Sequence, residues 1–143
     1  MENIFTGGIY RNCEVRITGA KHRPPAPSEM YLQIKEFFGG LACHDNLNPI
    51  ELAAYTHAEF VKIHPFEDGN GRTSRLIMNY QLMINGFLPV SIVKEKRLSY
   101  FETLEEYAVN GNLKPFADMI AELEAEQLKD YLTLLPVEKD KER

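Results

Sequence analysis

The segment from Asn48 to Ile63 constrains the fold more than any other part of the chain. Its apolar residues fall on most sides of a helix: Ile50, Leu52, Ala53, Ala54, Tyr55, Ala58, Phe60, Val61 and Ile63. A helix that is apolar on most sides has to be buried by its neighbours. Asn48 can cap its start, Pro49 suits the first turn, and Glu51 can reach back as in a capping box. The sequence therefore predicts a buried central helix that ends at about Ile63.

A dense polar motif follows directly over residues 64–75, HPFEDGNGRTSR. Gly69 and Gly71 allow the backbone to bend and to approach a ligand closely, because neither carries a Cβ atom. Apolar residues then recur at helical spacing, which predicts that a second helix begins just after the turn: Leu76, Ile77, Tyr80, Met83 and Ile84. A glycine turn that opens a helix presents free N–H groups at the positive end of the helix dipole. It therefore predicts an anion site.

The side chains of the motif point to the same chemistry. Arg72 and Arg75 are three residues apart, so they share one helix face near that opening. Guanidinium groups match phosphate oxygens in charge and in geometry. Asp68 can hold a divalent cation against the phosphates, and His64 is placed to move a proton. The simpler alternative, a solvated helix start, does not account for an imidazole, an acid and two arginines at one spot.

The remaining elements predict an all-helical bundle with one small β-hairpin. Residues 14–18 alternate polar and apolar side chains, which favours an exposed hairpin over residues 9–23. A helix is expected from Ser28, as its N-cap, to Gly39-Gly40. Another is expected over about residues 94–109, with an inward face of Leu98, Phe101, Leu104 and Ala108. The last is expected over residues 113–135, with an inward face of Phe116, Ile120, Leu123, Leu128, Tyr131 and Leu135.

Length and composition indicate one soluble domain. The 143 residues predict a single domain over residues 1–135 and a charged C-terminal tail over 136–143. The net charge of −5 disfavours nucleic acid as the main partner, and no apolar run reaches the length of a membrane span. Two cysteines, Cys13 and Cys43, suggest reduced thiols and a cytoplasmic protein. A zinc site shared by His57 and His64 is disfavoured, because the spacing is wrong and no third ligand is evident.

Residues 64–75 resemble the signature of the Fic family, H-P-F-x-[D/E]-G-N-G-R-x-x-R, at every fixed position. Gly8 to Pro27 is similar to the family's β-hairpin, called the flap, and Lys114-Pro115-Phe116 is similar to the start of the helix that closes its core. The resemblance covers about residues 8–135. It implies a Fic-type helical bundle and transfer of AMP from ATP to a Tyr, Thr or Ser hydroxyl of a target protein.

The resemblance also implies roles for individual residues. His64 would be the general base, and Asp68 would hold Mg²⁺. Gly69, Asn70 and Gly71 would form an anion hole that includes the Asn70 side chain, and Arg72 and Arg75 would orient the β- and γ-phosphates. Three residues are candidates for the adenine-binding wall: Tyr100, Tyr107 and Asn110. The target segment would align on the flap by strand pairing, at Val15, Arg16, Ile17, Thr18 and Gly19.

Many Fic proteins are inhibited by a helix with the pattern [S/T]-x-x-x-E-[G/N], whose Glu pairs with the second motif arginine, here Arg75. Only Ser91 to Glu95 has this spacing, and Lys96 follows where Gly or Asn is required. A de-inhibited form is therefore expected, active in auto-AMPylation. Either a separate antitoxin-like protein supplies the inhibitory helix, or the chain has been cut before the flap.

Alternatives remain open at this stage. A family branch that phosphorylates its target carries Lys where Gly71 stands, so Gly71 favours AMP transfer. UMP or phosphocholine donors, AMP removal and a non-catalytic nucleotide-sensing module are the other possibilities, although AMP removal would use the missing inhibitory Glu. A homodimer is also compatible with the family. Neither the target protein nor its modified residue can be read from the sequence.

Overall fold

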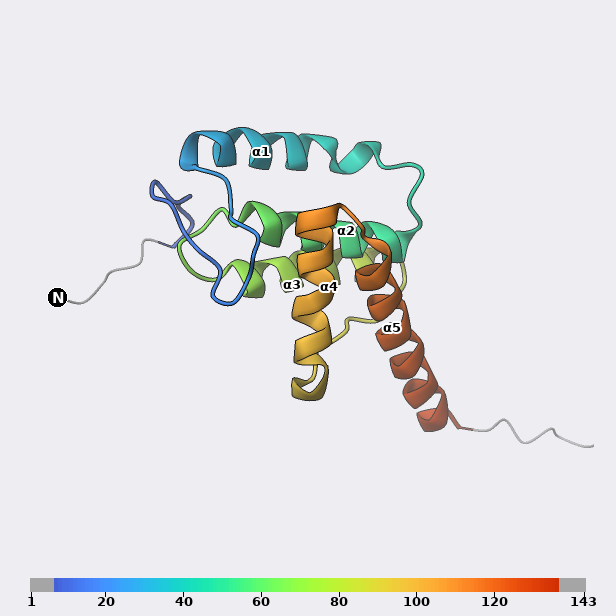
Figure 1. The fold of residues 1–143 in the computed structure, drawn as a ribbon. Coiled ribbons are helices and arrows are strands. Elements are labelled where there is room, and N and C mark those ends of the chain that lie inside the picture. Colours follow the sequence, from blue (N-terminus) through green and yellow to red (C-terminus); the bar gives the residue numbers. More distant parts are fainter. Residues whose placement is uncertain (1–6, 137–143) are drawn as a thin grey trace, which may run out of the picture.

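The computed structural model describes residues 7–136 (Figure 1). Within this range the chain forms five α-helices and two short 3-10 turns. The helices are α1 (Pro27–Gly40), α2 (Pro49–Ile63), α3 (Asn70–Ile84), α4 (Arg97–Asn110) and α5 (Lys114–Leu134), and the 3-10 turns are η1 (Leu41–Cys43) and η2 (Lys94–Lys96). None of the helices in residues 7–136 combines the length and the apolar character needed to cross a membrane.

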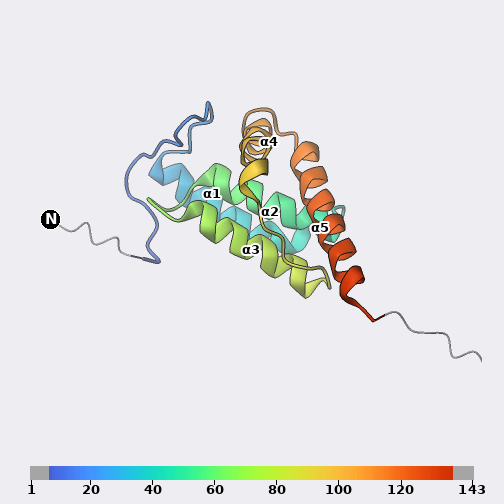
Figure 2. The same cartoon turned by 90° about the horizontal axis from the view of Figure 1, so that it is seen from below.

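Helix α2 is the centre of the bundle, as its sequence predicts. Helices α1, α2 and α3 lie alongside one another with alternating directions, and α4 and α5 stand across them (Figures 1 and 2). Helix α2 contacts all four other helices. The capping box at its start is present: Asn48 accepts a hydrogen bond from the Glu51 amide at 2.9 Å, and Glu51 accepts one from the Asn48 amide at 3.2 Å.

Two apolar cores lie on opposite sides of α2. The smaller core joins α1 to α2 through Met30, Ile34, Phe37, Phe60 and Ile63. The larger core fills the space among α2, α3, α4 and α5, and it includes Ala53, Ala54, Ala58, Met78, Leu82, Leu104, Phe116 and Ile120. Because α2 is clamped from both sides, its C-terminal end is a fixed point on which a functional group can be held.

The predicted β-hairpin is wrong, since the described residues of the flap form no strand. The alternating pattern of the sequence is still seen in the exposure of the side chains: Val15 and Ile17 are half-buried, whereas Arg16 and Thr18 are exposed. One turn hydrogen bond joins the Ala20 amide to the Ile17 carbonyl at 3.1 Å, with Gly19 at φ 79°. Two strands alone gain little stability in water. The Arg11 side chain, the Glu105 side chain and the Lys62 carbonyl hold the segment in place of a strand ladder, as described below.

The boundaries of α1 and α4 also differ from those predicted. Ser28 lies inside the first turn of α1, and Ala26 occupies the N-cap without a side-chain bond, because Pro27 already sets the helical φ at the first position. The end of α1 at Gly40 is as predicted. Residues 94–96 form η2, so α4 begins only at Arg97.

Parts of the predicted inward faces of α4 and α5 are wrong. Leu98 and Phe101 are 71% and 55% exposed, because α4 instead turns Tyr100 and Leu104 inward. On α5, Phe116, Ile120 and Leu123 are buried as predicted, but Leu128, Tyr131 and Leu135 are exposed. Beyond Glu126, which pairs with Lys96, the last turns of α5 extend past the other helices (Figure 1), so these side chains stay exposed. Apart from Pro136, the predicted tail lies outside the described residues.

Candidate active site

The candidate base, His64, is the C-cap of α2. Its backbone is left-handed (φ 53°, ψ 62°), and it is the one non-glycine residue of positive φ among those described. The His64 Nδ1 atom lies 3.2 Å from the Val61 carbonyl. A carbonyl can only accept, so Nδ1 carries the proton and Nε2 keeps its lone pair. The side chain is therefore held in the tautomer that a base acting through Nε2 requires.

The electrostatic environment of His64 favours the neutral imidazole. Burial lowers the pKa of His64, and the charges of Arg11 and His22 lower it further, against an opposing effect of the bond to Val61. A base has to be unprotonated before it can accept a proton. The local environment therefore favours the unprotonated imidazole that a base would need at neutral pH.

The loop between His64 and α3 is closed by Asn70, which is 3% exposed. Its Oδ1 accepts a hydrogen bond from the Phe66 amide at 2.9 Å, and its Nδ2 donates one to the Phe66 carbonyl at 2.7 Å. Both polar ends of the side chain are thus used inside the loop. In this structure the side chain therefore fixes the shape of the loop, and the prediction that it also lines the anion hole stays a prediction.

The start of α3 has the features of an anion site. Gly69 is its N-cap at φ 86°, and no side chain caps this end of the helix. The first N–H groups of an uncapped helix remain available to an anion, and the helix dipole favours negative charge there. The structure therefore places the backbone of Gly69, Asn70 and Gly71 at the positive end of α3, directly after the loop that begins at His64.

Both motif arginines fold back over this loop. A Cβ atom on Gly71 would lie 3.1 Å from Arg75 Nη1, and one on Gly69 would lie 3.3 Å from Arg72 Nη2. Arg72 Nη2 also lies 3.4 Å from Asp68 Oδ2, and both side chains are largely exposed. The glycines therefore make room for two guanidinium groups beside the free N–H groups of α3.

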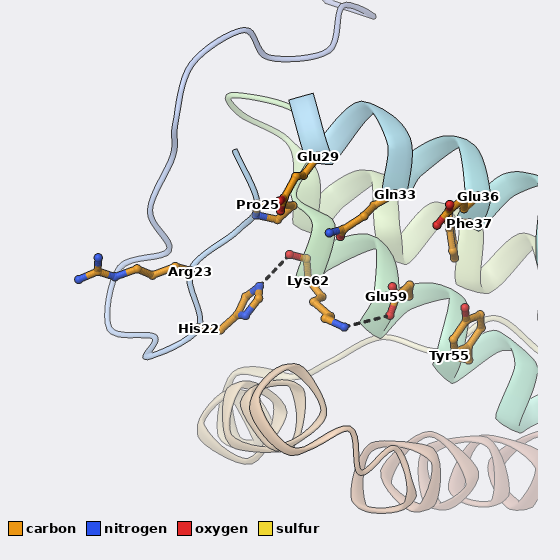
Figure 3. Close-up of a pocket in the computed structure, with 10 residues that line it drawn as sticks. All are labelled: His22, Arg23, Pro25, Glu29, Gln33, Glu36, Phe37, Tyr55, Glu59 and Lys62. Atoms are coloured by element: carbon orange, nitrogen blue, oxygen red, sulfur yellow. Dashed lines mark hydrogen bonds and ion pairs between the residues drawn. The ribbon is translucent and has the colours of Figure 1, made fainter. Parts of the chain in front are cut away.

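A cavity of about 510 Å³ opens on the outer side of the motif loop. Asp68, Gly69 and Arg72 line it, together with the segment from Gly7 to Asn12. A second cavity of about 430 Å³ lies between α1, α2 and the end of the flap (Figure 3). Its wall carries the carboxylates of Glu29, Glu36 and Glu59 together with His22, Arg23 and Lys62, and Lys62 pairs with Glu59 on the same helix. The first cavity contains motif residues, whereas the second contains none.

The three candidates for an adenine-binding wall do not line either cavity. Tyr100 is 5% exposed, and its hydroxyl lies 2.6 Å from His57 Nε2. Tyr107 donates a hydrogen bond to Glu59, and burial followed by this bond raises the pKa of Tyr107. Asn110 is exposed and donates to Glu106 at 2.9 Å. Burial leaves the Tyr100 ring without a free face for base stacking, whereas Tyr107 and Asn110 stay untested candidates.

The flap is held at its exit and open at its tip. Glu105 of α4 accepts hydrogen bonds from the amides of Lys21 and His22 at 2.7 and 3.0 Å. His22 Nε2 lies 2.8 Å from the Lys62 carbonyl (Figure 3). Over residues 15–18, the turn bond to Ile17 is the one hydrogen bond that the backbone makes within the described part of the chain. The remaining backbone groups of the tip are free to pair with another segment.

The sequence profile of the Fic/DOC family matches residues 1–82. The chain belongs to this family. It is 40% identical over 128 residues to the protein adenylyltransferase Fic of Culex quinquefasciatus, a match that covers 88% of this chain and 25% of that protein. The enzyme of the same name from Nematostella vectensis is 40% identical over 141 residues, covering 95% of this chain and 32% of that protein. The chain therefore spans about a quarter to a third of the length of these curated relatives.

Comparison with solved structures also identifies the Fic fold. A solved fragment of Fic-1 from C. elegans superposes with a TM-score of 0.78 at 32% identity, covering 89% of this chain and 37% of that chain. The all-helical prediction is thereby confirmed for the described residues, without the β-hairpin. The Fic motif occupies the loop between α2 and α3 and the first turns of α3.

Two buried polar residues that support the Fic motif were not recognised from the sequence. Arg11 is 1% exposed and bonds to the carbonyl of His64. His57 is fully buried, stacks on Phe116 with ring centroids 5.1 Å apart, and bonds to Tyr100. Burial lowers the pKa of His57 to about 4, so it is neutral and structural. Neither residue has a sequence signal, because arginine and histidine are more often exposed than fully buried.

Proposed function

We propose that this chain is a protein adenylyltransferase, which moves AMP from ATP to a Tyr, Thr or Ser hydroxyl of a target protein. The observation that carries this proposal is the placement of His64 Nε2, free to accept a proton, at the entrance of a loop that leads into the uncapped start of α3. Two guanidinium groups fold over the same loop. The curated relatives that carry the name protein adenylyltransferase support this reading.

In the proposed reaction, the hydroxyl oxygen of the target attacks the α-phosphorus of ATP. Its proton passes to His64 Nε2, the bond from the α-phosphorus to the bridging oxygen breaks, and pyrophosphate leaves. The lowered pKa of His64 suits it to accept this proton at neutral pH. Positioning and neutralisation of charge account for most of the catalysis in such transfers.

The start of α3 and the two arginines would hold the phosphates. The free N–H groups after Gly69 suit oxygens near the α-phosphorus, where charge develops during attack. Arg72 and Arg75 suit the outer phosphates, because guanidinium groups form paired hydrogen bonds to phosphate oxygens. On this assignment, Gly71 is needed for the close approach of Arg75 rather than for a special backbone conformation.

Asp68 fits a role as a magnesium ligand. It is largely exposed on the wall of the cavity beside the motif loop, with Arg72 as its partner. The described residues contain no group of three or more His, Cys, Asp or Glu side chains that could hold a metal ion. Mg²⁺ is commonly bound by one or two carboxylates together with substrate phosphates, so a single carboxylate is a suitable donor set. When bound, the ion would neutralise phosphate charge.

The open tip of the flap would present the target. Strand pairing needs only backbone groups, and the backbone of residues 15–18 has those groups free. The target segment and the flap would then form the strand pairing that the flap does not make by itself. Val15, Arg16, Ile17, Thr18 and Gly19 would thus dock a segment of the target beside His64.

The proposal is tested by incubating the purified chain with α-labelled ATP and Mg²⁺, alone and in a cell lysate, followed by mass spectrometry of modified hydroxyl residues. Label is expected on the chain itself and on a target. His64→Ala is expected to keep ATP affinity and to lose transfer by about 10²–10⁴-fold. ATP binding without any transfer would instead indicate a nucleotide-sensing module. Parallel reactions with labelled UTP and CDP-choline identify the donor, and faster transfer from either would refute AMP transfer.

Regulation is proposed to act at Arg75. Within residues 7–136, no carboxylate forms an ion pair with Arg75. An inhibitory glutamate, from a separate protein or from another segment, would pair with this guanidinium and displace the γ-phosphate. Adding such an inhibitor is expected to suppress ATP binding by the wild type but not by Arg75→Lys, which cannot form a paired bond to a carboxylate.

A further inference from the structure

Arg11 is a buried cation that forms no ion pair with a carboxylate within residues 7–136. It is 1% exposed, and its guanidinium donates to four backbone carbonyls. Nε donates to the His64 carbonyl at 2.7 Å, and Nη1 donates to the Cys13 carbonyl at 2.9 Å. Nη2 donates to the carbonyls of Pro25 and Ile63, the latter at 3.4 Å. Burial lowers the pKa of Arg11, but an arginine stays charged in proteins.

Two of these carbonyls belong to the end of α2 that carries the base. Ile63 is the last residue of α2 and His64 is its cap. The Arg11 amide also donates to the Pro65 carbonyl at 2.9 Å, so three successive residues of the chain accept bonds from Arg11. A cation at the C-terminal end of a helix is favoured by the helix dipole. These bonds hold His64 in a left-handed conformation that a residue with a Cβ atom adopts only when its surroundings impose it.

The other two carbonyls belong to the flap segment, residues 8–27. Cys13 lies near the start of this segment, and Pro25 lies near its end, next to the C-terminal turn of α2 (Figure 3). One planar guanidinium group therefore joins the entrance of the flap, its exit and the backbone of His64. A change at this group would move the flap and the base relative to each other.

We propose that Arg11 is a positioning residue, which sets the distance between the His64 imidazole and the target hydroxyl that the flap presents. This inference rests on the proposed function, because it assumes that His64 is the base and that the flap docks the target. Arg11 belongs to the wall of the cavity beside the motif loop, but each nitrogen of its guanidinium donates to a backbone carbonyl, so this proposal gives it no contact with ATP or the reacting atoms. Its loss would therefore slow transfer at saturating substrate, while the affinity for ATP would stay at its wild-type value.

The test compares Arg11→Lys and Arg11→Met with the control Arg97→Met. Lysine keeps the charge but has one nitrogen, so it cannot reach four carbonyls that lie in different directions. Methionine keeps most of the length and removes the charge and every donor. Arg97 is exposed at the start of α4, away from the flap and the motif, so its replacement by methionine tests the loss of an arginine alone.

Three quantities are measured on each variant: kcat for transfer to the target, the dissociation constant for ATP, and the titration of His64 by NMR. A shift of about 1 Å between reacting groups lowers a rate on the order of 10²-fold, and we expect a loss of this size in kcat for Arg11→Lys. ATP affinity is expected to be unchanged in both Arg11 variants. Arg97→Met is expected to match the wild type in all three measurements.

The NMR titration separates positioning from a general loss of structure. Among the charged groups that act on the His64 imidazole, Arg11 and His22 both lower its pKa. The pKa of His64 is therefore expected to rise in Arg11→Met and to stay near its wild-type value in Arg11→Lys, although both lose kcat. A wild-type kcat in folded Arg11→Lys, or a parallel loss of ATP affinity, would overturn the proposal.

The same data distinguish a failure of this inference from a failure of the proposed function. If the wild type transfers no nucleotide, the proposed function fails. The role of Arg11 is then decided by the His64 spectra and by hydrogen exchange of the flap amides, which do not depend on activity. If the flap amides exchange no faster in Arg11→Lys than in the wild type, Arg11 does not hold the flap in place and the inference fails.

Discussion

Replacing Asn70 by alanine distinguishes a structural role of this side chain from a direct role in binding phosphate. Asn70 is 3% exposed and makes two hydrogen bonds to the backbone of Phe66, of 2.9 and 2.7 Å. A buried hydrogen bond contributes about 1 kcal/mol net, so losing both costs about 2 kcal/mol. The Phe66 amide and carbonyl would also lose their partners, which raises the expected loss in the free energy of unfolding to about 3 kcal/mol.

Asn79 provides a matched control on the same helix. Its side chain makes the same pair of bonds to Val90, donating to the carbonyl at 3.1 Å and accepting from the amide at 2.9 Å. Asn79→Ala is therefore expected to destabilise the chain by a similar amount. Asn79 lies outside the motif, so its replacement is expected to leave transfer at saturating ATP unchanged.

Urea unfolding gives the free energies, calorimetry gives the ATP affinity, and labelled transfer gives kcat. Asn70→Ala is expected to lose kcat on the order of 10²-fold, because the loop that presents the phosphate-binding N–H groups loses its brace. The two variants should then differ in activity and not in stability. If Asn70→Ala unfolds at the same urea concentration as the wild type and only its ATP affinity falls, the side chain is a phosphate ligand and the reasoning fails.

Three further predictions concern buried titratable groups. Tyr100→Phe removes the hydroxyl that lies 2.6 Å from His57 Nε2, so the free energy of unfolding should fall by about 1–3 kcal/mol while the KM for ATP stays constant. A raised KM would show that Tyr100 contributes to nucleotide binding, either directly or through Arg75. Burial lowers the pKa of His64, so the acid limb of the kcat/KM profile should fall below pH 6.5, the ordinary histidine value, and a limb centred above that value would contradict the described environment. Glu124 accepts a hydrogen bond from the Leu88 amide with one oxygen and has no partner for the other, and burial raises its pKa. The native carboxyl thus holds its proton more tightly than the unfolded chain does, so stability should fall as pH rises through the raised pKa. Glu124→Gln should remove that loss, which urea unfolding at acidic and neutral pH would detect.

Local patterns in the sequence determined the helices and the location of the motif. The capping box at Asn48 and the apolar character of residues 50–63 depend only on neighbours along the chain, and both are present in the structure as predicted. The glycine turn predicted the start of α3 for the same reason. Spacing within one helix is a local property, and it survives folding when packing agrees with it.

Tertiary contacts decided the features that no local pattern carries. The flap has the alternation of a strand, but a strand needs a partner, and Arg11, Glu105 and Lys62 hold the segment without one. Helix α4 turns Tyr100 inward because its hydroxyl finds His57, 43 residues away, and this contact could not be read from either residue alone. Arg11 reaches the carbonyl of His64 across 53 residues. The sequence alone therefore identified the groups that we propose to perform the chemistry, whereas only the fold showed which buried side chains hold them in place.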